Sequence, residues 1–362
     1  MTKDFGWADV GERIRAARLS AGMSQSDLGN HIGLDRTMIA KIEAGARRVD
    51  ALELDGLSET LGLPLGHFLR RSPAVLSRRV DTLDDTATEA SGNMYRLEAL
   101  LADWLLDVRQ LVDFDVLEVP DVVNYPHPVD SQPAAQDAAL WLRTRLGLGV
   151  RPIGTLIEIS ERAGQMTLVA DLPGDGASLV QDGIAVAVVS AHGDPGRRRT
   201  TAAHELGHLV LGDEYSSDLG VNASRQEREA VINSFAAELL LPRSAVAAQC
   251  GNGAPSRQSL VELAATYRTS WSLVLQQSVR VGAIDRADLP RWRQNPTHAE
   301  FMDAIGWTPQ PDLESVQVPP SYARGVLAAW RQHRITSGRA VELMHGQISD
   351  TDLPAEDSEI AP

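Results

Sequence analysis

The sequence contains a single cysteine, Cys250, among its 362 residues, so it can form neither an internal disulfide bond nor a cysteine-rich zinc site. It also lacks a long apolar run. The longest nearly unbroken one, Ile184 to Ala191, is far shorter than the ~20 residues that cross a bilayer. The first twenty residues have no apolar core of the kind found in secretory signals. These absences predict a cytoplasmic protein in a reducing compartment, with no membrane partner.

Basic residues are also in short supply, with 34 Lys and Arg against 49 Asp and Glu, which gives a formal net charge of -15. The deficit is uneven along the chain. Residues 1–80 carry 12 basic and 10 acidic side chains, or +2, and the remainder carries 22 and 39, or -17. An acidic body repels nucleic acid, so we expect any contact with DNA to lie in the first eighty residues.

Hydrophobic periodicity predicts an α+β chain that is mainly α-helical, with short β-branched strands at Met166–Asp171 and Ile184–Val189. Between residues 97 and 111, apolar side chains recur every three or four positions. This stripe indicates one long amphipathic helix, which serves either as a core-packing seam or as a dimer contact. We expect four regions: a helical module (1–72), a linker with the amphipathic helix (73–133), a mixed domain (134–290) and a helical C-terminal region (291–362).

The first region shows the pattern of a helix-turn-helix. Ser24 is placed to cap one helix, and Asp35 follows the short Gly33–Leu34 joint and can cap the next. That next helix, residues 36–44, turns Ile39 and Ile42 inward and leaves a polar face outward. Such a helix reads bases in the major groove with side chains near its N-terminal end. On that face Arg36 can pair with guanine, and phosphates suit Lys41, Arg47 and Arg48.

The same stretch resembles the helix-turn-helix of the XRE family of Cro-like regulators. The resemblance lies in an S-Q-x-x-L-G opening from Ser24 and an I-x-K-I-E-x-G close from Ile39. It implies binding to a double-stranded DNA operator as a homodimer, with DNA contacts from Gln25, Arg36, Thr37 and Lys41. The alternative is a small helical module that binds protein instead.

A second motif, His204-Glu205-Leu206-Gly207-His208, points to a metal. Four residues advance a helix by ~400°, so both imidazoles lie on one face, with Glu205 beside them. Zinc suits neutral imidazole and lowers the pKa of a bound water to about 7, and a neighbouring carboxylate can take the proton. We expect this helix to begin at Thr200 or Thr201, after a turn over residues 193–199. The arginines at 197–199 would then form a solvated charge run beside the proposed cleft.

The third ligand has to come from a later acidic residue. Helical phase over residues 228–242 places Glu229 at the edge of an apolar stripe, with Glu227 and Glu238 pointing ~160° and ~180° away from it. One of these three residues at most can therefore face the metal. The remaining candidates precede this helix and are Asp213, Glu214 and Asp218.

The two segments together resemble the ImmA/IrrE family of zinc-dependent peptidases. The resemblance rests on A-H-E-L-G-H-L-V-L-G-D from Ala203 and on E-x-x-I-N-x-F-A-A-E-L-L-L-P from Glu229, and it covers residues 134–285. It implies a zincin-like fold and one Zn²⁺ held by His204, His208 and Glu229, with Glu205 as the catalytic base. It also implies that the substrate is a protein, itself a regulator.

These patterns favour a DNA-binding regulator fused to a zinc endopeptidase whose activity is gated. The strand at Ile184–Val189 would offer an edge on which an extended substrate adds as a further strand. Two alternatives stay open. In one, the zinc domain of a transcription factor is a non-catalytic sensor or partner platform. In the other, the chain is an antitoxin-like protein that represses its own operon.

Overall fold

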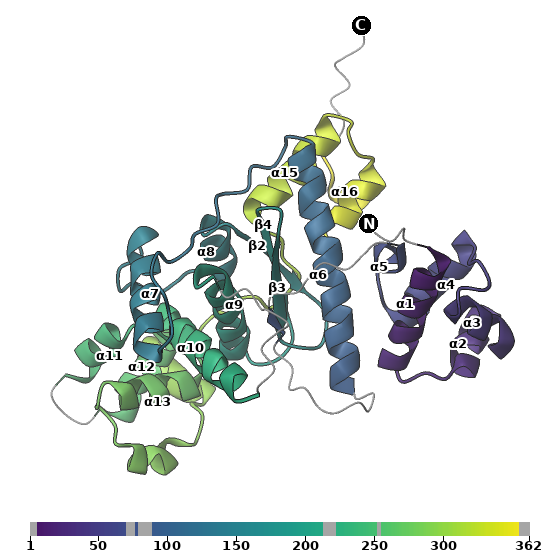
Figure 1. The fold of residues 1–362 in the computed structure, drawn as a ribbon. Coiled ribbons are helices and arrows are strands. Elements are labelled where there is room, and N and C mark those ends of the chain that lie inside the picture. Colours follow the sequence, from purple (N-terminus) through teal and green to yellow (C-terminus); the bar gives the residue numbers. More distant parts are fainter. Residues whose placement is uncertain (1–5, 70–76, 79–88, 213–221, 252–254, 355–362) are drawn as a thin grey trace, which may run out of the picture.

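The computed structural model describes residues 6–69, 77–78, 89–212, 222–251 and 255–354. The N-terminal module is all α-helical, and its helices pack around a core that includes Ile14, Leu28, Ile39 and Phe68. Its elements are α1 (Trp7–Ser20), α2 (Gln25–Ile32), α3 (Arg36–Glu43), α4 (Ala51–Leu61) and α5 (Leu65–Leu69) (Figure 1).

The caps expected from the sequence form in this module. The Ser24 hydroxyl accepts a hydrogen bond from the backbone N–H of Asp27, and Asp35 accepts one from the N–H of Met38. Each satisfies a donor that the first turn of a helix leaves without a partner. The joint between α2 and α3 turns through Gly33, whose φ of 72° suits a residue without a Cβ. The helix-turn-helix is therefore built as the sequence predicts.

The long amphipathic helix α6 (Glu89–Asp113) is a core element. Leu97, Leu101 and Trp104 are fully buried and pack with the apolar face of the sheet. On another side of the helix, Ala99 and Tyr95 pack into the core of the N-terminal module. Figure 1 shows α6 standing between that module and the sheet. The stripe is therefore a packing seam within the chain, which is one of the two roles expected from the sequence.

The sheet has the strand order β1-β3-β4-β2 and consists of β1 (Ser77–Arg78), β2 (Gln165–Ala170), β3 (Gly176–Gln181) and β4 (Ile184–Ser190). β4 runs parallel to β2, in the register Gln165↔Ala185, and antiparallel to β3. β3 and β4 are joined by Asp182 and Gly183, both with positive φ, the pairing that a tight hairpin turn needs.

The expectation that Ile184–Val189 forms an exposed edge is wrong. β4 is an inner strand, because β3 covers one of its edges and β2 the other. The sequence Gly-Ala-Ser at the start of β3 has low β propensity, so the sequence pattern does not predict this strand. The hairpin turn and the burial of Ala177 and Leu179 stabilise it in the fold.

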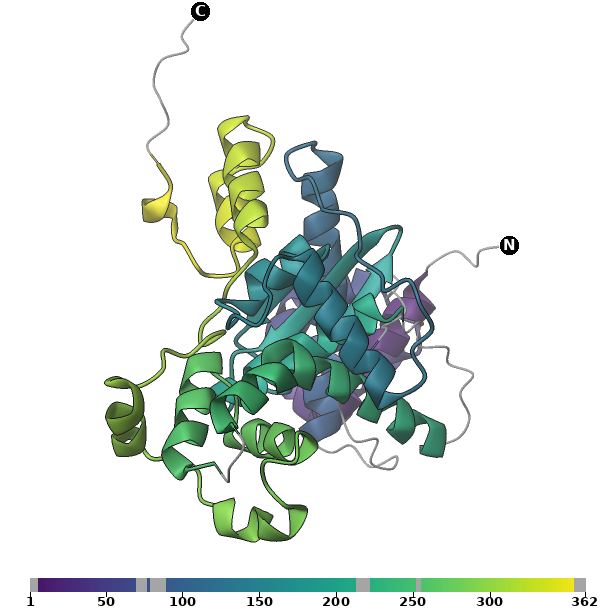
Figure 2. The ribbon, with the colours of Figure 1, turned by 90° about the vertical axis from the view of Figure 1, so that its left-hand side faces the viewer.

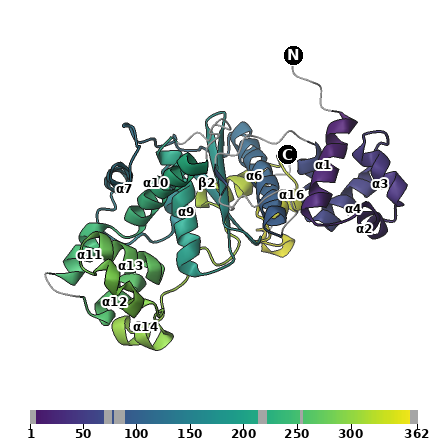
Figure 3. The ribbon, with the colours of Figure 1, turned by 60° about the horizontal axis from the view of Figure 1, so that its bottom comes forward.

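Helices cover both faces of the sheet. Alternate residues of β4 point to opposite sides: Val186 and Val188 lie in the same core as α6, and Ala185 and Val189 lie in the core formed with the helix of the HELGH motif and its neighbours. The helices on the second side are α7 (Gln132–Arg145), α8 (Leu156–Arg162), α9 (Pro195–Val210) and α10 (Asn222–Leu240). Figure 3 shows the N-terminal module and this second group on opposite sides of the sheet.

Helix α9 begins earlier than expected. It starts at Pro195 rather than at Thr200 or Thr201, because Asp194 caps it by accepting hydrogen bonds from the N–H groups of Gly196 and Arg197. Proline is favoured at the first helical position, where its missing N–H removes no intrahelical bond. The three arginines therefore belong to the first turns of the helix and not to a loop.

The chain after α10 is helical in two groups, which lie at opposite ends of the molecule in Figure 2. The first contains α11 (Arg243–Cys250), α12 (Arg257–Tyr267), α13 (Trp271–Arg280), the 3₁₀ segment η1 (Arg286–Trp292) and α14 (His298–Ile305). The second contains α15 (Pro320–Arg331), α16 (Ser337–Leu343) and η2 (Asp350–Asp352). In the second group, Tyr322 packs on Trp104 of α6, with ring centroids 4.4 Å apart. Within the described ranges, no helix has the length and apolarity that a membrane crossing requires.

Candidate metal centre and nucleic-acid interface

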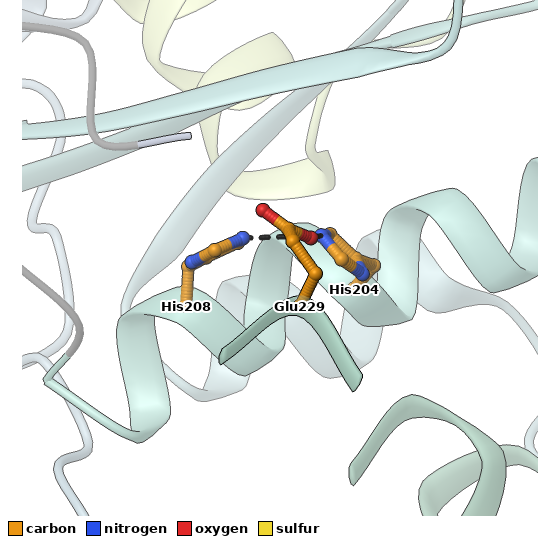
Figure 4. A group of neighbouring side chains, drawn as sticks. All are labelled: His204, His208 and Glu229. Atoms are coloured by element: carbon orange, nitrogen blue, oxygen red, sulfur yellow. Dashed lines mark hydrogen bonds and ion pairs between the residues drawn. The ribbon is translucent and has the colours of Figure 1, made fainter. Parts of the chain in front are cut away.

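The two histidines of the HELGH motif lie one turn apart on α9 and face the same point (Figure 4). Each is only 1% exposed. Their Nε2 atoms are 3.1 Å apart, and the rings meet edge to face. Two imidazole nitrogens at this separation, in an interior position, are placed to share one ion.

Glu229 reaches the same point from the neighbouring helix α10, as Figure 4 shows. Its Oε2 lies 3.2 Å from Nε2 of His204, and the three ligand atoms all lie within 4.8 Å of one another. Ligands about 2.05 Å from a tetrahedral zinc are about 3.3 Å from each other. Two of the observed separations are already close to that value, so the His204, His208 and Glu229 side chains fit a divalent metal.

A glycine allows the two helices to come this close. A Cβ added at Gly207 of α9 would lie 2.9 Å from the Phe235 ring and 3.1 Å from a methyl group of Ile232 on α10. Separations this short force one of the groups to move. The glycine of H-E-L-G-H thus sets the distance at which Glu229 meets the histidines.

Asn233 is a site residue whose role the sequence analysis missed. Its Oδ1 accepts a hydrogen bond from Nδ1 of His204 over 3.0 Å. Because an amide oxygen only accepts, Nδ1 carries the proton and Nε2 keeps the lone pair that a metal needs. The signal was present in the sequence, since Asn233 follows Glu229 by four residues and therefore shares its helix face.

Glu205 directly follows His204 in α9 and is completely buried. Ser178 of β3 donates a hydrogen bond of 2.7 Å to its Oε2, and Gln165 of β2 donates to its backbone oxygen. Its Oε1 has no hydrogen-bond partner among the described residues. A buried carboxylate oxygen without a donor is an unfilled acceptor, and it belongs to the residue that directly follows the ligand His204 in α9.

Of the other acidic candidates, Glu238 is buried but engaged elsewhere. It accepts hydrogen bonds from the N–H and Nε of Arg243 and from Nε2 of Gln277. Glu227 is exposed. The remaining candidates, Asp213, Glu214 and Asp218, lie outside the described residues. The described carboxylate at the metal cluster is therefore that of Glu229.

The expected solvated run at 197–199 is wrong for two of its three arginines. Arg197 is exposed and pairs with Asp175 at 2.8 Å. Arg198 and Arg199 are buried, at 7% and 0% exposure. Arg199 pairs with Asp312 and donates to the carbonyl oxygens of Ile153 and Gly154. Since α9 starts at Pro195, the helix turns these two side chains into the interior.

The polar face of α3 is exposed as the sequence predicts. Arg36, Thr37 and Lys41 are open to solvent, and so is Arg48 after the helix. Gln25 begins α2 and is half-buried, and its amide donates a 2.8 Å hydrogen bond to Oε2 of Glu43. The module therefore presents cationic and hydrogen-bonding groups along one helix, as major-groove readers do.

Two ion pairs organise this face. The buried Arg18 and Glu43 form a double hydrogen bond, with N–O distances of 2.6 and 3.0 Å. Arg47 forms another with Glu53, at 2.6 and 2.7 Å, and the bond from Arg47 holds the pKa of Glu53 below its usual value. Because Glu53 already engages Arg47, the phosphate contact expected of Arg47 stays a prediction.

Comparison with known families and proteins separates two parts of the chain. The family model described as helix-turn-helix matches residues 14–68, and the one described as IrrE N-terminal-like domain matches residues 164–277. Uncharacterized HTH-type transcriptional regulators from Sinorhizobium medicae and Rhizobium meliloti are each 41% identical to this chain over 64 residues. Those residues are 18% of this chain and 46% of each relative, so the chain spans about half the length of the relatives it matches.

Among solved structures, PlcR of Bacillus thuringiensis in complex with the peptide PapR7 and DNA is 10% identical, over 93% of this chain and 91% of that one. Its TM-score of 0.19 is too low for the likeness to support a conclusion about fold or ligand. The two family matches do support a conclusion about the domains of the chain, because each covers a region whose geometry is described above. The chain therefore joins an XRE-type helix-turn-helix domain to an IrrE-like metallopeptidase-family domain.

Proposed function

We propose that the chain is a cytoplasmic, DNA-bound transcriptional regulator whose IrrE-like domain is a zinc-dependent endopeptidase that cleaves a protein regulator. The observation that carries the enzymatic part is Glu205. Its carboxylate is buried, belongs to the residue that follows His204 in α9, and has one oxygen without a partner among the described residues. A purely structural metal site does not need a spare carboxylate at that point, whereas hydrolysis does.

The cluster supplies the ligands, and zinc is the metal that two neutral imidazoles and one carboxylate with an open fourth position favour. A metal bound there supplies Lewis acidity, which acidifies water and polarises a carbonyl group. His204 is held in the metal-binding tautomer by Asn233. His208 and Glu229 complete the set from one turn along α9 and from α10.

Glu205 moves the proton. Ser178 fixes one oxygen of its carboxylate by donating to Oε2, which leaves Oε1 to accept the proton of the attacking water. The same carboxylate then returns the proton to the amine of the leaving peptide. The low-dielectric surroundings of a fully buried side chain strengthen both transfers, because bulk water does not compete for the carboxylate.

The N-terminal domain brings this chemistry to an operator. Arg36, Thr37 and Lys41 on α3, together with Gln25 on α2, contact bases and neighbouring phosphates, and Arg48 contacts phosphates. A homodimer on paired half-sites is the arrangement such modules use. A peptidase tethered at a promoter meets other regulators bound there at a high local concentration, so a protein regulator is the substrate we propose.

The test combines metal content with a search for cleavage. Full-length protein should hold one zinc per chain, and the His204→Ala and Glu229→Gln variants should lose it. Glu227→Gln, an exposed change on the same helix, is the matched control and should keep it. Stoichiometric zinc in the Glu229→Gln variant would assign the third ligand to another residue.

Cleavage is read in cells that carry either the wild-type chain or the Glu205→Gln variant. Newly formed protein N-termini should occur in the wild type alone, while both proteins occupy the same operators. If the two strains yield the same N-termini and regulate the same genes, the peptidase reading is wrong. The zinc domain would then be a non-catalytic platform.

A further inference from the structure

A cavity of about 1090 Å³ lies next to the metal centre, at the N-terminal ends of α9 and α13. Asn233, whose amide holds His204, forms part of its wall. Sites for small organic ligands have volumes of about 300–1,000 Å³. The cavity has the size of a ligand site, and the zinc chemistry proposed above does not use it.

One end of the cavity carries surplus positive charge. Arg199 and Arg268 both line it, and the side chain of Arg199 is entirely buried. Asp312 pairs with Arg199, while Arg268 donates to the carbonyl oxygen of Ile153. Burial is the main cause that lowers the pKa of Arg199 to about 10, and the charge of Arg268 lowers it further. Two guanidinium groups thus face one carboxylate at this end.

The other charged groups of the lining are Asp194 and Arg197, and each has an interaction of its own. Asp194 is engaged as the cap of α9, where its carboxylate accepts from two backbone N–H groups. Arg197 at the rim pairs with Asp175. The surplus is therefore local: Arg199 and Arg268 share Asp312, while Asp194 keeps its negative charge at the positive N-terminal end of α9.

Two buried donors at that end lack an acceptor within the described part of the chain. They are Nε of Arg199 and the hydroxyl of Thr269, and Thr269 is 8% exposed. A buried donor without a partner is energetically costly, so an acceptor supplied by a ligand is favoured there. The aromatic side chains of Trp271 and Phe301 also line the cavity and give it an apolar surface.

We propose that this cavity binds a small organic carboxylate. The two carboxylate oxygens accept from Arg199 Nε and the Thr269 hydroxyl, the surplus charge at Arg268 attracts them, and the organic part lies against Trp271 and Phe301. Two donors without partners match the two oxygens of a planar carboxylate better than the several oxygens of a phosphate. This inference does not rest on peptidase activity.

The test measures binding to zinc-loaded, full-length protein by titration calorimetry, with benzoate and hexanoate as probes. At least one of the two should bind saturably. Its neutral amide, benzamide or hexanamide, and inorganic phosphate should bind far more weakly. The Arg268→Gln and Thr269→Val variants should each lose affinity by roughly tenfold or more, because each removes a charged or hydrogen-bonding contact to the anion.

The control variant is Arg280→Gln, which removes an arginine at the far end of α13, outside the cavity lining. It should bind the carboxylate as the wild type does. Thr269→Val preserves shape, and equal zinc content and circular dichroism show that each variant is folded. Three results would overturn the proposal: no saturable binding of either carboxylate, equal binding of acid and amide, or unchanged affinity in both cavity variants. Saturable binding of an acidic peptide that is weakened in the Arg268→Gln variant, without binding of the small acids, would overturn the proposal and assign the cavity to a protein ligand.

Discussion

Replacing Glu43 by alanine should strongly destabilise the N-terminal module while leaving the rest of the chain intact. Glu43 is 7% exposed and accepts two hydrogen bonds from Arg18 and one from Gln25. Its loss leaves the Arg18 guanidinium buried without its charge partner. Breaking a buried pair from one side costs about 3–5 kcal/mol. A module of this size has a total stability of roughly 3–9 kcal/mol, so the change removes much of it.

Hydrogen exchange in the full-length protein is the suitable assay, because it reads the module and the sheet separately. A loss of about 3 kcal/mol lowers the protection of core amides in α1 and α3 by roughly 100-fold. Amides of β4 should exchange as in the wild type. The double variant Arg18→Met/Glu43→Leu should recover most of the protection, since apolar residues replace a buried pair at little cost.

The double variant also separates stability from function. It is folded but gives the Gln25 amide no carboxylate to bind, so its operator affinity should stay below that of the wild type. Exchange in Glu43→Ala that is slowed or accelerated less than tenfold would refute the reasoning. So would a double variant that is no more protected than the single one.

Three further predictions concern other sites. Burial, helped by the charge of Arg13, lowers the pKa of His67 from 6.5 to about 4, so between these pH values the unfolded module binds more protons than the folded one. The stability of the folded module should therefore fall by at most about 3 kcal/mol as the pH drops from 6.5 to 4, and hydrogen exchange should show no such loss in His67→Phe. Gly207→Ala should push α9 away from α10, destabilise the protein by about 1–3 kcal/mol and weaken zinc binding in a chelator competition. Gly338→Ala, which has open space around it, should change neither stability nor zinc affinity, and unchanged zinc affinity in Gly207→Ala would contradict the packing argument. In operator-binding titrations, Arg36→Ala should relax base preference, whereas Arg48→Ala should lower the affinity for all DNA sequences alike and reduce the salt dependence by about one counterion. The same affinity at low and high salt would rule out phosphate contacts.

The sequence allowed the parts with strong local signals to be predicted. Capping residues at Ser24 and Asp35 and the inward spacing of Ile39 and Ile42 depend on neighbours a few positions away, and these helices formed as expected. The one-turn spacing of His204 and His208 likewise depends on helix geometry alone. Local rules suffice where a helix decides which face a side chain occupies.

Features that depend on tertiary pairing could not be predicted. Strand order is fixed by β3, whose first residues favour no strand, so β4 could not be recognised as an inner strand. The contact between Ser178 and Glu205 joins residues 27 positions apart. The burial of Arg199 depends on Asp312, which lies 113 residues away. The early start of α9 is different, because the Asp194–Pro195 pair is a local signal for a helix start that the sequence analysis did not use.

Helix α6 constrains how a chain of this kind can be recombined. Its 25 residues form a rod of about 37 Å, and the rod supplies side chains to two cores at once. Tyr95 binds His67 of the N-terminal module, while Trp104 donates to a backbone oxygen of β2. A different DNA-reading module grafted at residue 72 would meet a helix face shaped for the original one. An exchange of modules therefore has to carry the first half of α6 with it, so the unit that can be exchanged ends inside a helix and not in the segment before it.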